Sequence, residues 1–247
     1  MLACEENEDG CLDVRSTNFN VNAVTACDSC CILPIARLDV NLNFDTLPFR
    51  FGAIYGINGG EDSVQVITFR LPFSDFTFSN STTAYEVLDT MLNVQPVHKD
   101  DFLIVESTSL RTIGFTDFID TVTTVDFTVG YDRPALEALQ PFIDLSPTIR
   151  ALEVINRFYV DSTDTYFMAE LSVDIGDSLR RLQVPLIQDP ILRLEYDDPI
   201  ELALGISWNV PMNIDVSMML EGIEPEQSNE LMAETIGNNI SAAITGN

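Results

Sequence analysis

A strict alternation of apolar and polar side chains constrains the fold of this 247-residue chain more than any other feature. In residues 38–45 every second residue is apolar, and every residue between them is Asp or Asn. Successive side chains of an extended strand point to opposite faces, so this run predicts a strand with one face on a core. The alternation returns in residues 125–129, 167–173, 200–206 and 212–218.

Turn-forming residues separate these runs. They include Asn58-Gly59-Gly60, Asp161-Ser162-Thr163-Asp164, Pro185, Pro190 and Pro199. Many short strands separated in this way are typical of β-sandwiches and barrels. We therefore predict an all-β chain in which residues 34–247 form an antiparallel β-sandwich, immunoglobulin-like or jelly-roll-like.

Two segments show helical spacing. Residues 133–142 predict a short helix with Pro134 in its first turn. At the C-terminus, apolar residues recur every four positions, and Ser228 is placed to cap the helix that they predict. These apolar residues are Met232, Ile236, Ile240 and Ile244. We expect this helix to cover an open end of the sandwich, with docking to a partner as the alternative.

Residues 10–33 contain four cysteines and too few apolar residues to build a core. We therefore expect two disulfides and an oxidising, extracytoplasmic compartment. The cysteines are Cys11, Cys27, Cys30 and Cys31. A bond between the adjacent Cys30 and Cys31 would be strained, so each of them is expected to pair with Cys11 or Cys27. A zinc site is the competing use, but four thiolates this close fit tetrahedral geometry poorly.

Charge and motifs exclude several functions. The chain has 39 acidic and 12 basic residues and a formal net charge of −27, which excludes nucleic acid as a partner. It has no G-x-S-x-G elbow, glycine-rich phosphate loop or H-E-x-x-H motif, and adjacent acidic pairs such as Asp197-Asp198 face opposite sides of a strand. A catalytic triad would need the single histidine, His98. We expect no enzymatic activity and no catalytic residue.

The first nine residues resemble the end of a bacterial lipoprotein signal. Met1-Leu2-Ala3-Cys4 is followed by an acidic run, and this pattern is similar to the signal that sends Bacteroidota lipoproteins to the cell surface. The resemblance implies lipidation of Cys4 and residues 1–9 as anchor and tether. The alternative is an incidental cysteine. No run of eighteen apolar residues predicts a membrane-spanning helix.

Residues 10–30 resemble a short cysteine and Asx segment, G-C-x-D followed by N-x-N and a later Cys, that recurs in surface proteins of the same bacteria. Alternating Asn residues would turn their amide oxygens to one side of an extended backbone, where carboxylates could complete a calcium site. The candidate ligands are Asp13, Asn18, Asn20, Asn22 and Asp28. The alternative is that these residues cap tight turns. The sequence establishes no cofactor with certainty, and calcium is the one candidate.

Residues 38–80 resemble the opening of the MbnP-like family of extracytoplasmic, outer-membrane-associated copper-binding proteins. The resemblance lies in the strand ending at Phe44, the run from Tyr55-Gly56 into a glycine turn, and the strands ending near Phe78; residues 126–134 resemble a later strand of the family. It implies a β fold. The family's copper sites use several imidazoles and a modified tryptophan, whereas this chain has only His98 and Trp208, so at most weak copper binding is implied.

Six Asp-Ser or Asp-Thr pairs, each followed by an apolar residue or Thr, resemble the O-glycosylation site of Bacteroidota. Their hydroxyl residues are Thr46, Ser63, Thr90, Thr121, Ser162 and Ser178. Together with the lipoprotein resemblance, they predict a lipid-anchored, cell-surface protein of the outer membrane that serves as an accessory subunit of an envelope protein complex. A metal-binding MbnP-like module is the alternative. A glycan-binding protein is less favoured because the chain has a single tryptophan, and a hydrolase is also less favoured.

Overall fold

The computed structural model describes residues 9–86, 91–92, 95–96, 103–116, 120–130, 159–160, 165–185 and 191–246. Strands predominate over these residues. The elements in chain order are β1 (Asp9–Gly10), β2 (Thr25–Ala26), the 3₁₀ helix η1 (Asp28–Cys30), β3 (Ile35–Phe44), β4 (Leu47–Pro48), β5 (Ile54–Ile57), the 3₁₀ helix η2 (Asn58–Gly60), β6 (Asp62–Ser79), β7 (Ala84–Glu86), β8 (Met91–Leu92), β9 (Gln95–Pro96), β10 (Leu103–Val105), β11 (Ser109–Phe115), β12 (Val122–Val129), β13 (Tyr159–Val160), β14 (Thr165–Ile175), β15 (Ser178–Pro185), β16 (Ile191–Ile200), β17 (Trp208–Asp215), α3 (Val216–Met219), α4 (Asn229–Ala243) and β18 (Ile244–Thr245).

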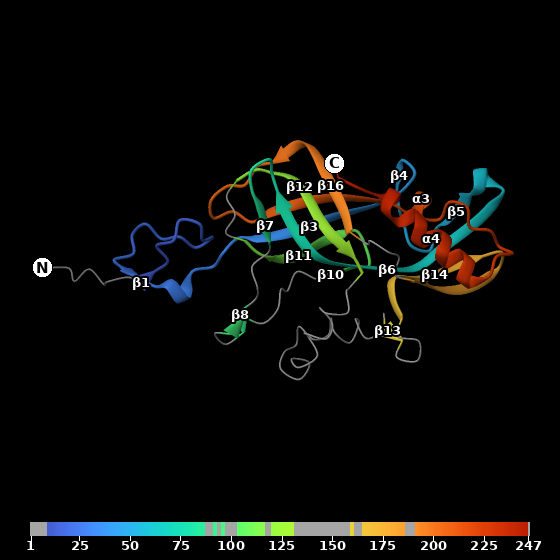
Figure 1. Cartoon of the computed structure of the whole chain (residues 1–247), viewed down its shortest axis with the longest axis horizontal. Helices are drawn as coiled ribbons and strands as arrows, with labels where there is room; N and C mark the ends of the chain where they lie inside the picture. The colour runs from blue at the N-terminus through green and yellow to red at the C-terminus, as the bar shows by residue number, and fades with distance from the viewer. Residues whose placement is uncertain are drawn as a thin grey trace, which may run out of the picture.

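Two large sheets form the domain and share one hydrophobic core, as the sandwich prediction requires. The first sheet has the order β13-β14-β6-β12-β16, and β5, β7 and β10 also pair with β6 while β15 pairs with β14. The second has the order β11-β3-β17-β18, with β4 on β3. The predicted all-β class and sandwich are confirmed (Figure 1).

One ladder of the second sheet departs from the predicted antiparallel arrangement. β17 runs parallel to β3, from Trp208 opposite Ala36 to Asp215 opposite Asn43. Parallel neighbours need a long connection between them, and most of the chain separates these two strands. A local alternation pattern cannot predict such a pairing between segments that are far apart in the sequence.

The core follows from the alternation along the strands. In β3 every second residue is buried, and its inward side chains are Ala36, Leu38, Val40, Leu42 and Phe44. Phenylalanines of the facing sheet fill the space between the layers: the ring of Phe127 lies 5.0 Å from that of Phe73 and 5.5 Å from that of Phe76. Burial of these large apolar side chains is the main stabilising contribution to the fold.

Two of the predicted strand runs are partly wrong. β16 ends at Ile200, and beyond it Leu202 still packs against the core, whereas Leu204 and Ile206 are 51% and 59% exposed. In the last run β17 ends at Asp215, because the carboxylate of Asp215 caps the short helix α3. Met218, predicted to continue the strand, therefore lies on α3 and is 39% exposed.

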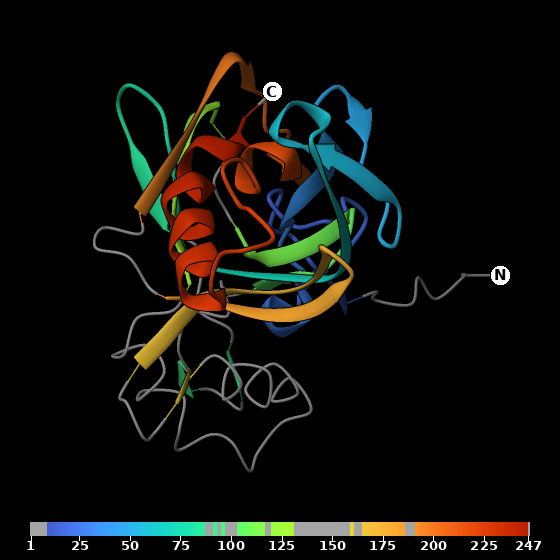
Figure 2. The ribbon, with the colours of Figure 1, turned by 90° about the vertical axis from the view of Figure 1, so that its right-hand side faces the viewer.

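The C-terminal helix is confirmed. Ser228 is the N-cap of α4, and its hydroxyl accepts a hydrogen bond from the backbone N–H of Leu231 at 3.3 Å. Met232, Ile236 and Ile240 are fully buried, and α4 packs on β15 and α3. The helix thus covers the end of the sandwich that faces the viewer in Figure 2. The helix predicted at 133–142 lies outside the described residues, as do the turn at 161–164 and Pro190.

Residues 10–33, here called the stem, project from one end of the sandwich. The long axis of the molecule runs from the stem to the opposite end, where β4, β5, α3 and α4 lie (Figure 1). The stem contacts the loop between β16 and β17: a Cβ on Gly205 (φ +68°) would lie 2.7 Å from the carbonyl oxygen of Ser16. Among the described residues, no helix combines the length and the apolar composition needed to cross a bilayer.

Candidate functional site

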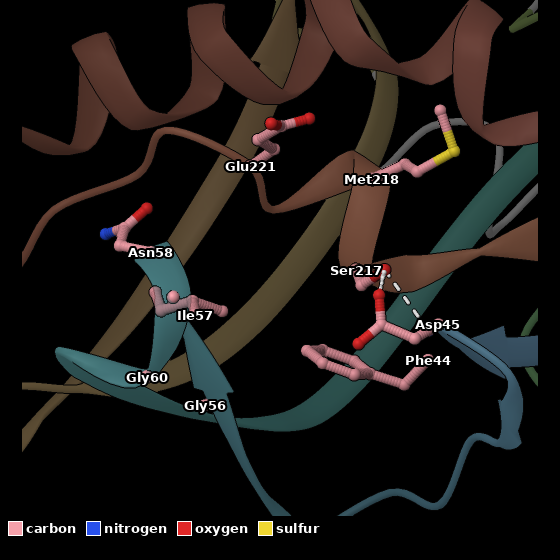
Figure 3. A pocket seen from close by; sticks show the side chains of 10 residues that line it. Phe44, Asp45, Gly56, Ile57, Asn58, Gly60, Ser217, Met218 and Glu221 are labelled. Atoms are coloured by element: carbon pink, nitrogen blue, oxygen red, sulfur yellow. Dashed lines mark hydrogen bonds between the residues drawn. The ribbon is translucent and has the colours of Figure 1, made fainter.

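A pocket of about 500 Å³ lies at the end of the sandwich opposite the stem. Three parts of the chain line it: the turn between β3 and β4, the end of β5 with η2, and helix α3 with the residue that follows its C-cap. We call it the end pocket. Phe44 and Ile57 are buried beneath it, whereas Asp45, Asn58 and Glu221 are exposed around it (Figure 3).

Left-handed backbone at η2 shapes one wall of the end pocket. Asn58, Gly59 and Gly60 have φ angles of 54°, 73° and 88°. Asn and Gly tolerate this region, whereas other side chains are strained there. A Cβ on Gly59 or Gly60 would meet nothing within 4 Å, so backbone conformation, not space, favours glycine at these positions. The turn predicted at Asn58-Gly59-Gly60 is confirmed.

A hydrogen-bonded clamp joins the β3–β4 turn to α3. Asp215 accepts from the backbone N–H groups of Ser217 and Met218 at 2.9 and 3.4 Å, as an N-cap does. The Ser217 hydroxyl lies 2.6 Å from Oδ1 of Asp215 and 3.0 Å from Oδ1 of Asp45. The backbone N–H of Asp45 in turn lies 3.2 Å from that hydroxyl. Asp45 itself has a positive φ of 52°, which turns the chain sharply between β3 and β4.

A second clamp holds the other wall. The side-chain amide of Asn58 donates to Oδ2 of Asp62 and to the carbonyl oxygen of Ile223, each at 2.9 Å. Asn58 therefore ties η2 to the loop between α3 and α4. With both walls fixed to the C-terminal segment, the end pocket is preformed.

The end pocket has carboxylates around its opening and apolar side chains at its base. Asp45 and Glu221 offer carboxylate oxygens, and Phe44, Ile57 and Met218 offer apolar surface. Among the described residues, no Arg, Lys or His contributes to the lining. Such a lining suits a ligand group with an apolar body and a positively charged or hydrogen-bond-donating tip. An anionic group would meet carboxylates without compensation.

Removal of the Asp215 carboxylate, the N-cap of α3, should measurably lower the stability of the domain. We expect Asp215→Ala to lower the free energy of unfolding by about 1 kcal/mol, because two N–H groups of α3 lose their acceptor. Urea denaturation of the purified domain measures this difference. Asp198→Ala, at an exposed position of β16, is the matched control and should change stability by less than about 0.5 kcal/mol. Equal effects of the two changes would contradict the role of Asp215.

The stem contains one of the two predicted disulfides. Cys11 and Cys31 are bonded, with Cα atoms 4.9 Å apart. Cys27 and Cys30 are free thiols, so the second predicted disulfide is not formed in this structure. The Cys30 thiol donates instead to the carbonyl oxygen of Cys27 at 2.9 Å. Cys4, the predicted lipidation site, lies outside the described residues.

The predicted calcium ligands are engaged mostly in local bonds. Asp13 forms an ion pair with Arg15 at 2.8 Å, and this partner holds the pKa of the Asp13 carboxyl below its usual value. The Asn18 side chain donates to the carbonyl oxygen of Cys30 and accepts from the backbone N–H of Ile32. Asn20 accepts from the backbone N–H of Asn22.

These contacts are those of turn-capping residues, the alternative reading of the segment. In the described residues, the side chain of Asn22 makes no hydrogen bond to the other candidate calcium ligands. The side chain of Asp28 lies outside the described part of the structure. No group of three or more His, Cys, Asp or Glu within reach of one ion occurs over the residues described. Calcium binding stays a prediction.

The predicted glycosylation residues are distributed over both ends of the domain. Thr46 and Ser63 are exposed beside the end pocket, and Ser178 is exposed as the first residue of β15. Thr121 is half-buried before β12, where its carbonyl oxygen accepts from Asn80 at 3.0 Å. Thr90 and Ser162 lie outside the described residues. Glycosylation itself stays a prediction.

Of the two residues that the copper resemblance singles out, the structure describes only Trp208. Trp208 is buried at the start of β17, where its ring lies 4.8 Å from that of Phe78, so it is a core residue. His98, with the neighbouring Asp100 and Asp101, lies outside the described residues. The end pocket, by contrast, was not predicted from the sequence. The Asn58-Gly59-Gly60 turn, which the sequence predicts only as a break between strands, forms one of its walls.

The described residues define a β-sandwich domain on a disulfide-stapled stem, with an acidic pocket at its far end. No protein-family model matches the sequence, and no curated protein matches it either. Among solved structures, MbnP from Methylosinus trichosporium is similar, with a TM-score of 0.43 and 9% identity over 75% of this chain and 76% of that chain. This distant similarity concerns the arrangement of the strands alone, so the binding properties of this chain follow from its own residues.

Proposed function

We propose that this protein is a non-catalytic binding module that serves as an accessory subunit of a protein complex in the cell envelope. In this proposal an acylated Cys4 holds it to the outer membrane, at the cell surface. The observation that carries the proposal is the position of the end pocket, at the opposite end of the long axis from the stem (Figures 1 and 2). An anchor at the N-terminus would leave the end pocket facing away from the membrane.

The chemistry of the end pocket favours a basic protein segment as its ligand. The aliphatic part of a Lys or Arg side chain can lie on Phe44 and Met218 while its charged group meets Asp45 or Glu221. The net charge of −27 would speed the approach of such a segment at low ionic strength. The volume of about 500 Å³ suits one or two side chains, as in peptide recognition by a small pocket.

The side chains that line the end pocket support a binding function over a catalytic one. The Ser217 hydroxyl is held by the carboxylates of Asp45 and Asp215, and neither residue can act as the imidazole base of a serine hydrolase. In the part of the chain that the structure describes, no basic residue lines the end pocket to orient the anionic group of a substrate. A binding role needs only the two clamps, which fix the walls of the end pocket, and the exposed carboxylates of Asp45 and Glu221.

Co-purification from native membranes tests this proposal. The protein is extracted in mild detergent, and mass spectrometry identifies its partners and the mass of the N-terminal peptide. We expect stoichiometric recovery with an outer-membrane complex and an acylated Cys4. Recovery of the protein alone, with unmodified Cys4, would contradict both the accessory role and the anchor.

A variant pair tests the end pocket itself. Asp45→Asn with Glu221→Gln should reduce recovery of the partner by about tenfold or more, because charged pairs in an interface contribute on the order of 1.5 kcal/mol or more. Asp197→Asn with Asp198→Asn removes the same charge from exposed positions of β16 and should leave recovery unchanged. Equal recovery with both variant pairs would mean that the partner binds elsewhere.

A further inference from the structure

Two thiols lie on one turn of the stem. Cys27 and Cys30 flank Asp28 and Ser29, and η1 forms the turn between them. The backbone is fixed at both ends: the N–H of Cys27 donates to the carbonyl oxygen of Gly10 at 2.9 Å, and the carbonyl oxygen of Cys30 accepts from Asn18 at 2.7 Å. The Cys30 thiol, donating to the Cys27 carbonyl, points back along the turn towards Cys27.

The two free thiols are accessible. Cys27 and Cys30 are both half-buried, so a reagent can reach them. In the neighbouring disulfide, Cys11 is 1% exposed and Cys31 is half-buried. The stem therefore combines one disulfide with a reachable thiol pair beside it.

The two thiols are not equivalent. The neighbouring Cys30 side chain lowers the pKa of the Cys27 thiol, which also lies 3.8 Å from the Ser29 hydroxyl. The Cys27 side chain in turn raises the pKa of the Cys30 thiol. A thiolate is the nucleophile in thiol chemistry, so Cys27 is the sulfur that reacts first. Cys30, still protonated and one turn away, is placed to react second.

Metal binding is a poorer use for this pair. A soft metal ion held in a stable tetrahedral site needs further ligands besides two thiolates. Over the residues described, no third His, Cys, Asp or Glu joins these thiols in a group that could hold an ion. Two thiols on a turn without a third ligand suit exchange with a disulfide.

We propose that Cys27 and Cys30 form a thiol–disulfide exchange site whose substrates are disulfides. The pair passes from two thiols to one Cys27–Cys30 disulfide as it reduces one substrate disulfide. This inference goes beyond the binding function proposed above and does not depend on the end pocket.

The exchange proceeds in two balanced steps. The Cys27 thiolate attacks one sulfur of a substrate R–S–S–R; the substrate S–S bond breaks, a mixed Cys27–S–S–R disulfide forms, and the first R–S⁻ leaves. Cys30 then loses its proton and attacks the sulfur of Cys27, which forms the Cys27–Cys30 bond and releases the second R–S⁻. Two electrons pass to the substrate, and the two thiol protons end on two R–SH molecules.

Reaction with cystamine tests the proposal. This small cationic disulfide is chosen because the protein carries a formal net charge of −27. The full chain is incubated with cystamine, quenched with iodoacetamide and mapped by mass spectrometry. We expect the wild-type protein to end with a Cys27–Cys30 disulfide and no adduct. Cys30→Ser should accumulate a mixed disulfide on Cys27, about tenfold faster than Cys27→Ser accumulates one on Cys30.

Three results would overturn the proposal. One is a lasting adduct on wild-type Cys27 or Cys30, and another is an equal reaction rate for the two serine variants. The third is a bond from Cys27 or Cys30 to Cys11 or Cys31, which would make all four cysteines one interchangeable set. The same peptide map checks that the Cys11–Cys31 bond is intact in each variant, and the wild-type result stands even where a variant misfolds.

Discussion

Phe127→Ala is expected to lower the free energy of unfolding of the sandwich by about 3–5 kcal/mol. Phe127 is 1% exposed, and its ring contacts those of Phe73 and Phe76 from the neighbouring strand β6. The substitution removes both aromatic contacts and leaves a cavity between the sheets, which β12 cannot fill because it is paired on both sides. Equilibrium urea denaturation followed by tryptophan fluorescence measures the loss, since Trp208 lies in the same core.

Phe51→Ala is the matched control for this prediction. Phe51 is 37% exposed and contacts Phe49 at the edge of the aromatic group beside β5. We expect a loss of about 1 kcal/mol or less, since much of this ring already meets water. A Phe127 variant as stable as the Phe51 variant would mean that the two sheets do not pack through these rings.

Replacing both Cys11 and Cys31 by serine is expected to lower the stability of the stem by about 3 kcal/mol, because the bond closes a loop with a sequence separation of 20 residues. Three amides report this loss in hydrogen exchange: Thr17, Asn20 and Cys27, which donate to Ile32, Cys11 and Gly10. Their protection should fall by on the order of a hundredfold. Both cysteines are replaced so that neither remains free to pair with Cys27 or Cys30.

The amides of β3 are the internal control. The sandwich has its own core, so their exchange should be unchanged in the double variant. Loss of protection in β3 as well would show that the stem and the sandwich unfold as one unit. Unchanged protection in the stem would mean that its turns, not the disulfide, determine its stability.

The elements that the sequence predicts well are those whose pattern is local. The alternation in residues 38–45 matches β3, because one face of that strand meets the core along its whole length. Asn58-Gly59-Gly60 matches η2 because left-handed backbone selects those residue types. Ser228, Met232, Ile236 and Ile240 match α4, whereas Ile244 begins β18. Each of these features depends on its own neighbours in the chain.

The features that the sequence does not predict depend on distant contacts. The parallel pairing of β3 with β17 brings together residues about 170 positions apart, and so does the hydrogen bond between Ser217 and Asp45. The alternation of residues 212–218 continues past Asp215, but the cap at Asp215 ends the strand. The end pocket arises where these distant segments meet, so no local motif marks it.

The entry of β3 into the sandwich has a mechanical consequence. β3 follows the stem directly and runs towards the end pocket, with β11 on one side and β17 on the other. A pulling force between an N-terminal anchor and a partner at the end pocket would act along this strand. The inter-strand hydrogen bonds lie across that direction, so the force loads them in shear. Many bonds must then break together before β3 can slide, which favours a linkage that withstands tension.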